Sequence, residues 1–249
     1  MARNANKVAT QSSGNKVPQK ALSGSFPARI VQVVFLGVQE QRAYKGVAKP
    51  PVDQLRITYE LSHEFMMDEN GEPVADKPRW ESEQIAFHAA SVDLATSTKR
   101  FKTYRPDASI NDYNWDDSLL GTAVQVTLTS RDVTEGKHAG KTFTDITGVT
   151  PAAQMPGYVQ PELVNASVFF DPQDESVSVE AFNGLPDFMQ DIIKGALDYA
   201  DSELCAALAG GGAPVAPKAP APAPAPTLSV PNTDYDFAAQ TSGEEVNPF

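Results

Sequence analysis

The chain has 249 residues, of which 41% are hydrophobic, so it is long enough to bury the core of about one ordinary domain. Its formal net charge is -12, yet residues 1–141 carry 18 of the 20 Lys and Arg against 17 acids. Residues 142–249 carry the other two Lys against 15 acids, so the negative charge belongs to the C-terminal part. The overall acidity therefore does not exclude a nucleic-acid partner for the first part.

The N-terminal segment, residues 1–20, is polar and lacks the apolar core of a signal peptide, so we expect a disordered arm. Apolar runs elsewhere are strand-length, which is too short to cross a membrane. The single cysteine, Cys205, has no partner for an internal disulfide. These features predict a soluble, cytoplasmic protein without a membrane partner.

Five segments have the composition or alternation of β-strands. Residues 26–38 are rich in β-branched side chains, and residues 54–61, 79–88 and 122–133 alternate apolar and polar positions. Residues 142–149 follow the turn residues of a hairpin and read as a further strand. Between the third and fourth segments, residues 91–120 mix a short helix, expected near residues 91–99, with turns. This order predicts a mainly β domain over residues 21–208, an OB-fold-like five-stranded antiparallel barrel, although a small sandwich would give a similar pattern.

A basic and aromatic segment follows the third strand. Four cations there alternate with two aromatic residues, a combination suited to single-stranded nucleic acid because phosphates attract cations and unstacked bases pack on rings. The prediction is that the rings stack on bases and the cations follow phosphates; the alternative is a solvated basic loop with Phe101 in the core. The segment comprises Lys99, Arg100, Phe101, Lys102, Tyr104 and Arg105.

Two further loops carry basic residues. In an OB-type barrel, the loop after the first strand and the hairpin between the last two strands flank the nucleic-acid-binding face. We therefore include their cations and one tyrosine in the predicted binding surface, although in a sandwich they would be ordinary turn residues. They are Arg42, Tyr44, Lys45 and Lys49 in the first loop, and Arg131, Lys137 and Lys141 in the hairpin.

Catalytic and metal-binding patterns are not evident in the sequence. The three histidines, His63, His88 and His138, are scattered, so a zinc site is not expected. Glu81 and Glu83 share one predicted strand face, but no Ser/His/Asp or metal constellation accompanies them. The sequence predicts a protein that is not an enzyme and has no catalytic residues, metal or cofactor.

Residues 185–208 have the periodicity of a C-terminal helix. Pro186 suits the first turn, and the apolar positions Met189, Ile193 and Leu204 fall on one face together with Ala196 and Ala200. We expect this face to pack on the barrel. A homo-oligomer in which the same face forms a dimer seam is the alternative.

The C-terminal segments read as a tether and a docking peptide. Residues 209–232 are rich in Gly, Pro and Ala and predict an extended linker. Residues 233–249 predict a disordered acidic tail that binds a partner protein through Glu244, Glu245, Pro248 and Phe249. Phe249 offers an apolar side chain beside its own carboxylate, while Pro248 restricts the backbone before it.

This C-terminus resembles that of single-stranded DNA-binding proteins of bacteria and their phages, whose acidic tails end in an aromatic residue. The resemblance covers the tail, the linker and, more loosely, a β-rich body. It implies sequence-nonspecific binding of single-stranded DNA in phage DNA replication, recombination and repair, and recruitment of replication and recombination proteins by the tail. The alternative is a β-rich structural or adaptor protein of a virion, without nucleic-acid binding.

Overall fold

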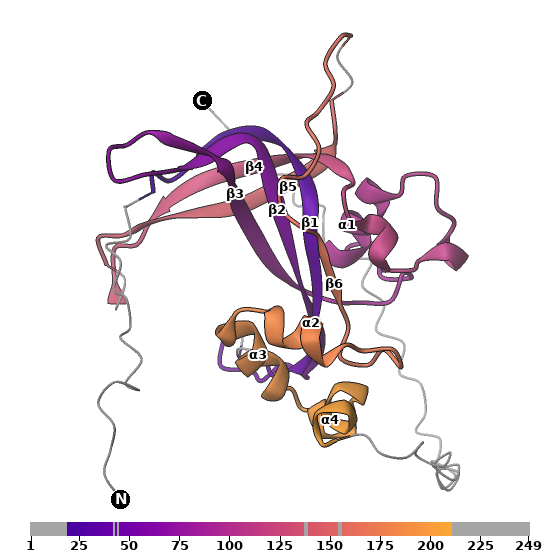
Figure 1. Ribbon diagram of the computed structural model, residues 1–249. Coiled ribbons are helices and arrows are strands. Elements are labelled where there is room, and N and C mark those ends of the chain that lie inside the picture. Colours follow the sequence, from indigo (N-terminus) through magenta and orange to yellow (C-terminus); the bar gives the residue numbers. More distant parts are fainter. Residues whose placement is uncertain (1–18, 42, 44, 137–138, 154–155, 211–249) are drawn as a thin grey trace, which may run out of the picture. The chain divides into compact units, whose positions relative to one another are not determined.

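The computed structural model describes residues 19–41, 43, 45–136, 139–153 and 156–210 (Figure 1). Six strands and four α-helices make up most of this part, with 3-10 turns at Ile110–Asp112, Asp117–Leu119 and Tyr199–Asp201. The strands are β1 Gly24–Gln39, β2 Val52–Met67, β3 Pro73–Ala86, β4 Ala123–Asp132, β5 Thr142–Pro151 and β6 Val168–Phe170. The helices are α1 Thr96–Tyr104, α2 Val179–Gly184, α3 Asp187–Lys194 and α4 Glu203–Leu208.

The strands form one sheet in the order β3-β2-β1-β4-β5, in which all neighbours are antiparallel. The short strand β6 pairs in parallel with β1. The prediction of a mainly β fold built on an antiparallel sheet is therefore confirmed. Among the described residues no ladder joins β3 to β5, so the sheet is open where a barrel would close.

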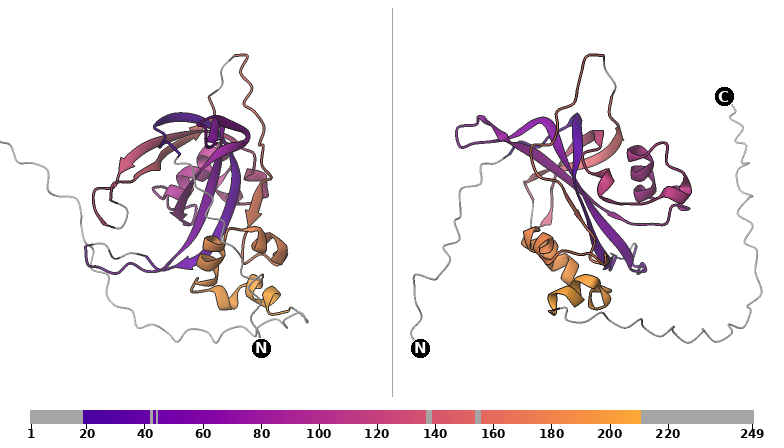
Figure 2. Two further views of the ribbon diagram at one scale, coloured as in Figure 1. Left: turned by 60° about the vertical axis from the view of Figure 1, so that its left-hand side comes forward. Right: turned by 45° about the vertical axis from the view of Figure 1, so that its right-hand side comes forward.

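β1 is the central strand and changes neighbours along one edge. Its first half, from Gly24 to Arg29, pairs with β4, and residues Gln32 to Val34 pair with β6. β2 follows the other edge, with register shifts between Ile30 and Gln32 and between Phe35 and Gly37. Such bulges bend and twist a strand, which allows β1 to pair with β4 and then with β6 along the same edge (Figure 2).

The second irregularity in β1 requires glycine. Gly37 has a φ of +73°, and a Cβ at this position would lie 2.7 Å from Oδ1 of Asp198 and 2.8 Å from Cβ of Ala196. Any side chain would therefore meet both backbone strain and a steric clash. The close approach lets the segment that follows α3 lie against the end of β1.

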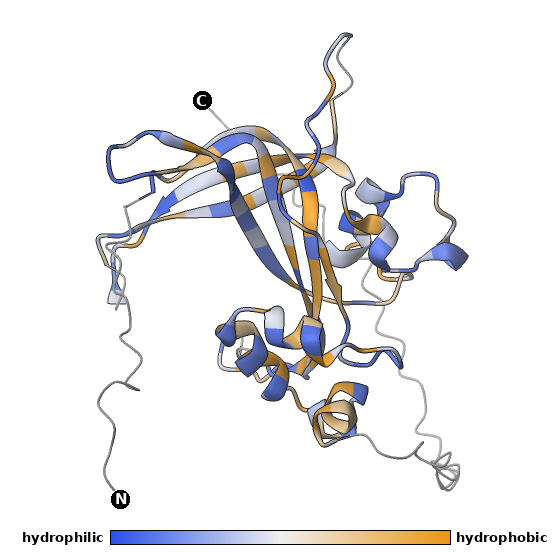
Figure 3. Cartoon of the chain, in the orientation of Figure 1, coloured by the Kyte–Doolittle hydropathy of each residue, from blue (hydrophilic) through white to orange (hydrophobic). Residues whose placement is uncertain are grey.

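Two hydrophobic clusters lie on opposite faces of β1. The first contains Val33 and Phe35 with side chains of β2, β4, α1 and the loop that follows α1. The second contains Val34 and Leu36 with side chains of β6, α2, α3 and α4. In Figure 3, hydrophobic colouring accordingly continues along β1 toward the C-terminal helices. Burial on both faces explains why this stretch has a continuous apolar run instead of an alternating pattern.

The predicted continuous helix over 185–208 is wrong. α3 ends at Lys194, Gly195 forms its C-cap, and α4 begins at Glu203 after Ser202, whose Oγ accepts a hydrogen bond from the backbone N–H of Cys205 at 3.1 Å. The helix-breaking glycine and the capping serine interrupt a periodic apolar pattern. Met189, Ile193 and Leu204 are buried nevertheless, because both short helices pack on the second cluster.

The chain divides into two units at Gly211, and the second unit, Gly212–Phe249, lies outside the described residues. Most of the predicted N-terminal arm and almost all of the predicted linker lie outside them as well, with the whole tail. The assignments made to these segments therefore remain predictions.

Candidate nucleic-acid interface

The basic and aromatic segment forms most of helix α1, with Arg105 as its C-cap. A helix places residues three or four apart on one side, so Phe101 and Tyr104 share a face with the buried Thr98. Lys99 and Lys102 lie on the exposed side. The segment therefore separates its aromatic side chains from its lysines instead of presenting them together.

Phe101 and Tyr104 belong to the first hydrophobic cluster, where their exposed fractions are 3% and 5%. The ring centroid of Phe101 lies 4.3 Å from that of Tyr113 and 5.8 Å from that of Trp115, and the Tyr104 ring meets Trp115 edge-on at 5.9 Å. A ring enclosed in this way offers no face to a base. The prediction that Phe101 and Tyr104 stack on bases is wrong, because a helix turned both rings into the core.

Arg100 is engaged in a largely buried ion pair. Its Nε lies 2.7 Å from Oε1 of Glu83, and a second guanidinium nitrogen lies 2.9 Å from Oε2. The Tyr59 hydroxyl donates to the same Glu83 Oε1 at 2.6 Å and accepts from the Tyr104 hydroxyl at 2.5 Å. Only 12% of the Arg100 side chain is exposed, so the prediction that it follows phosphates is wrong. Glu83 holds the guanidinium inside the fold.

The electrostatics of this network match its geometry. Burial raises the pKa of Tyr59, and the neighbouring Tyr104 and Glu83 raise it further. The pKa of Tyr104 is also raised by burial and by the Glu83 carboxylate. Although burial lowers the pKa of Arg100, hydrogen bonding and charge attraction from Glu83 outweigh that effect, and the net shift is upward. Both tyrosines therefore stay neutral, and the Arg100 guanidinium stays charged.

The remaining cations of this segment are more accessible. Nζ of Lys102 lies 2.9 Å from Oδ1 of Asp93, in a pair whose side chains are 62% and 74% exposed. Surface pairs of this kind contribute about 0–1 kcal/mol, so a phosphate can replace the carboxylate. Lys99 is exposed, and Arg105 donates a hydrogen bond to Oγ of Ser118. Lys99, Lys102 and Arg105 remain predicted phosphate contacts.

The two predicted loops lie at the β1–β2 connection and the β4–β5 hairpin. In the left-hand view of Figure 2 both project to the same side of the sheet. Lys45 and Lys49 are exposed in the first, whereas Lys141 and Arg131 are exposed in the second. Nε of Arg131 lies 2.5 Å from Oδ2 of Asp145, again at the surface. Arg42, Tyr44 and Lys137 lie outside the described residues.

A surface that the sequence reasoning missed lies on the outer face of β2 and β3. The pairs Arg56–Gln84, Thr58–Ser82 and Glu60–Trp80 project from this face, opposite the face that carries Leu55, Ile57 and Tyr59. Trp80 is 40% exposed, and its Nε1 donates to Oε2 of Glu60 at 3.1 Å. Thr58 and Glu60 on this face are buried, so the accessible part near them is the Trp80 ring, and an anchored and exposed indole is a suitable platform for a base.

Arg56 on the same face has no carboxylate partner among the described residues. Its guanidinium lies 5.4 Å from the ring centroid of Phe188 on α3, and this ring is 50% exposed. Burial lowers the pKa of Arg56, and its Nε is buried without a hydrogen-bond partner. A phosphate would supply the missing charge. The sequence could have pointed to Arg56, because this residue occupies a polar position of the segment with the clearest apolar-polar alternation.

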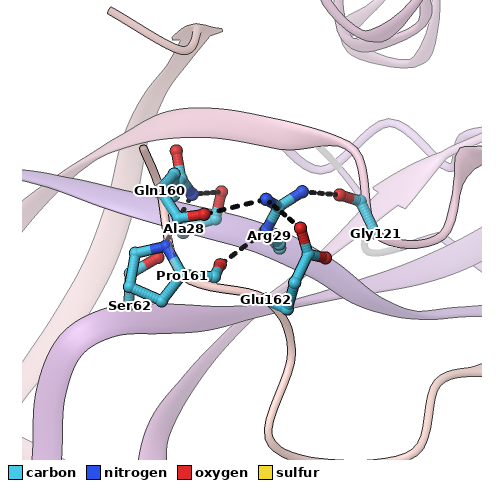
Figure 4. A network of polar contacts seen from close by, with 7 residues as sticks. All are labelled: Ala28, Arg29, Ser62, Gly121, Gln160, Pro161 and Glu162. Atoms are coloured by element: carbon cyan, nitrogen blue, oxygen red, sulfur yellow. Dashed lines mark hydrogen bonds and ion pairs between the residues drawn. The ribbon is translucent and has the colours of Figure 1, made fainter. Parts of the chain in front are cut away.

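A segment of residues 158–165, here called the strap, is fixed across β1 and β2. The Arg29 guanidinium donates to the carbonyl oxygens of Pro161, Gln160 and Gly121 at 2.7, 3.0 and 2.7 Å, and it pairs with Glu162 at 3.0 Å (Figure 4). These bonds tie three positions of the strap to one side chain of β1. The strap therefore has a defined path beside the outer face.

Glu60 fastens the other end of the strap and also orients Trp80. Its carboxylate accepts from the backbone N–H of Val164 at 2.6 Å and from Nδ2 of Asn165 at 2.6 Å. Glu60 is only 4% exposed, so these donors replace the water that a buried carboxylate loses. The position of the exposed indole thus depends on a buried charge.

Three carboxylates meet where β1 ends and β2 begins. Oδ1 of Asp198 accepts from the backbone N–H of Val38 at 2.9 Å. Burial raises the pKa of Asp53 to about 6, and the nearby Asp198 and Asp171 add to the shift. Burial also raises the pKa of Asp171. Ionisation of Asp53 therefore costs more free energy in the folded protein than in the unfolded chain.

This arrangement predicts a pH-dependent difference between the wild type and Asp53→Asn. Because the pKa of Asp53 rises from 3.8 to about 6 on folding, its protonated form stabilises the fold at low pH. That contribution is lost as the pH rises from about 4 to above 6. Over this range the wild type should lose about 1–3 kcal/mol relative to Asp53→Asn.

Urea denaturation of both proteins at pH 4.5 and pH 7.5 measures this difference. Asp107→Asn, which changes an exposed acid, is the control and should follow the wild type. A wild type that gains stability relative to Asp53→Asn between these pH values would contradict the argument.

No protein-family model, no curated protein and no solved structure matches this chain. The described residues contain no group of three or more His, Cys, Asp or Glu side chains placed to hold a metal ion. In the same part of the chain no helix is long and apolar enough to cross a membrane.

Proposed function

We propose that this chain is a non-enzymatic protein that binds single-stranded DNA without sequence specificity and recruits other proteins through its C-terminal tail. The arrangement of the sheet supports an OB-type fold. The strand order β3-β2-β1-β4-β5, with α1 between β3 and β4, is the order of such a barrel, and β3 and β5 approach each other at the open side.

The observation that carries the proposal is the outer face of β2 and β3. Trp80 lies near one end of this face, and Arg56 beside Phe188 lies near the other. Gln84, the cross-strand partner of Arg56, is four residues from Trp80, a separation of about 13 Å at 3.3 Å per residue. The face therefore offers one ring to each of two bases and a guanidinium to a phosphate.

The basic loops extend this surface electrostatically. Lys45, Lys49, Arg131 and Lys141 would attract the sugar-phosphate backbone, and the accessible cations of α1 would add to the attraction. The acidic tail would compete with DNA for the same cations and leave when a strand binds. Phe249, with Glu244 and Glu245, would then dock replication or recombination proteins.

Substitution of Trp80 tests this surface. Trp80→Ala should weaken binding of a single-stranded oligonucleotide about 5- to 100-fold, because one base-aromatic stack contributes about 1–3 kcal/mol. Trp80→Phe should retain most of the affinity, since it keeps a ring. Fluorescence anisotropy of a labelled strand at low and moderate salt, with duplex competitor, measures both variants.

Leu94→Ala is the control for this experiment. Leu94 is 83% exposed and lies outside the outer face, so its loss should leave affinity unchanged. Arg56→Gln should reduce both affinity and salt dependence, because one phosphate contact is lost. Equal affinity of wild type and Trp80→Ala, or equal binding of duplex, would contradict the proposed interface.

A truncation after Ala209 tests the role of the tail in the same assay. The shortened protein should bind the strand more tightly, and the gain should shrink as salt rises because the competition is electrostatic. If neither form binds single-stranded DNA, the structural or adaptor function takes its place.

A further inference from the structure

A pocket lies where β1 and β3 end and β2 begins, away from the outer face. Its volume is about 340 Å³, within the range of pockets that hold small ligands. Phe35, Phe87, Tyr113 and Trp115 line it. The Phe87 ring meets both Phe35 and Trp115 edge-on, at centroid distances of 5.2 and 6.0 Å. The aromatic walls favour a flat ligand.

Three carboxylates line the same pocket, those of Asp53, Asp171 and Asp198. Oδ1 of Asp198 is occupied by the backbone N–H of Val38, and its Oδ2 accepts from Nε2 of Gln173 at 3.0 Å. Oδ1 of Asp53, in contrast, is buried without a partner. The pocket therefore offers acceptors to N–H donors and repels phosphates.

Two donors complete the polar groups. Trp115 is 8% exposed, and its Nε1 is buried without a hydrogen-bond partner. The hydroxyl of Tyr113 is likewise buried and unpartnered. Buried polar groups without partners are uncommon in folded proteins and call for an explanation. A ligand with hydrogen-bond acceptors would satisfy both donors, and reaching them requires a small rotation of each ring because neither atom has accessible surface.

We infer that this pocket, which is separate from the sequence-nonspecific outer face, is an additional base-selective site that binds an unpaired, amino-bearing nucleobase, with guanine preferred. Guanine is flat, and its adjacent N1–H and N2–H groups can donate to both oxygens of one carboxylate. Its carbonyl oxygen and its ring nitrogens N3 and N7 are acceptors for Trp115 and Tyr113. Thymine has no amino group and can supply only one donor, so it should bind more weakly.

Other ligand classes meet fewer of these requirements. An alkylammonium ion would satisfy the carboxylates but would leave both donors without acceptors. A free phosphate would face three carboxylates. A metal ion lacks a suitable group of ligands among the described residues. The nucleobase is the class that uses the rings, the carboxylates and the donors together.

Isothermal titration of the full chain with guanosine and with thymidine tests the inference. Guanosine should bind and thymidine should bind at least several-fold more weakly. Asp53→Asn should weaken guanosine binding about 10- to 100-fold, because it removes a hydrogen bond to a charged acceptor. Trp115→Phe keeps an aromatic ring but removes the indole N–H and part of the ring surface, and it should cause a smaller loss because the charged acceptor remains. Asp107→Asn, an exposed acid outside the pocket, is the matched control.

The source of the base is decided with two oligonucleotides, an all-thymine strand and the same strand with one guanine. Extra affinity for the guanine strand that Asp53→Asn removes would show that the base belongs to a bound strand. Guanosine binding without that extra affinity would show that the pocket takes a free nucleoside.

Trp80→Ala separates this pocket from the proposed outer face, because it should weaken strand binding and leave guanosine binding intact. The inference is overturned if guanosine and thymidine bind equally, if neither binds, or if free arginine binds and guanosine does not.

Discussion

Replacement of Phe101 by Ala should lower the free energy of unfolding by about 3–5 kcal/mol, the usual cost of removing a buried aromatic ring. Phe101 is 3% exposed and packs against Tyr113 and Trp115. Its loss would open a cavity between α1 and the loop that follows it. Urea denaturation followed by circular dichroism measures the change. Single-stranded DNA binding of the wild type and the variant should be compared at equal concentrations of folded protein.

Phe188→Ala provides the contrast for this substitution. The Phe188 ring is 50% exposed, so its removal should cost little stability while weakening single-stranded DNA binding. Phe101→Ala should lower stability strongly, while the folded fraction of this variant should bind single-stranded DNA as the wild type does. A stable Phe101→Ala protein with a large loss of strand affinity would restore the stacking role that the sequence predicted for this ring.

Replacement of Arg100 by Ala should destabilise the fold by about 3–5 kcal/mol, since it leaves a buried carboxylate without its cation. Glu83 would keep only the hydrogen bond from the Tyr59 hydroxyl, and its side chain is 11% exposed. Lys102→Ala, which breaks the exposed pair with Asp93, should leave the free energy of unfolding nearly unchanged. Thermal and urea unfolding of both variants measure the difference between a buried and a surface pair.

A second substitution checks the cause. Adding Glu83→Gln to Arg100→Ala should recover part of the lost stability, because it removes the uncompensated charge while retaining an acceptor for Tyr59. If Arg100→Ala is as stable as the wild type but binds single-stranded DNA more weakly, the guanidinium serves phosphates instead of Glu83.

Several features followed from local patterns in the sequence. The alternation over residues 54–61 predicted β2, because a strand with one buried face repeats every two residues. A short helix was expected near residues 91–99, and α1 lies several residues later, at Thr96–Tyr104. Outside the described residues, the linker and the acidic tail remain assignments by composition alone.

The candidate site was less accessible to sequence reasoning. Seven consecutive residues cannot show which of their side chains face a core until the helix that contains them has a neighbour. Tertiary packing turned Phe101 and Tyr104 inward and placed Arg100 on Glu83, a residue of β3 seventeen positions earlier. The outer-face residues Arg56, Trp80 and Phe188 come from three separate elements, so only the folded sheet brings them together.

The sequence by itself determined the mainly β class, the approximate strand positions and the separation of charge along the chain, because these depend on periodicity and composition. Only the tertiary structure decided the partners of β1, the break after Lys194 and the identity of the exposed rings. Those features depend on contacts between residues far apart in the chain. The local sequence around a hydrophobic or basic residue is the same whether that residue contacts another part of the protein or a ligand, so the sequence does not identify the partner.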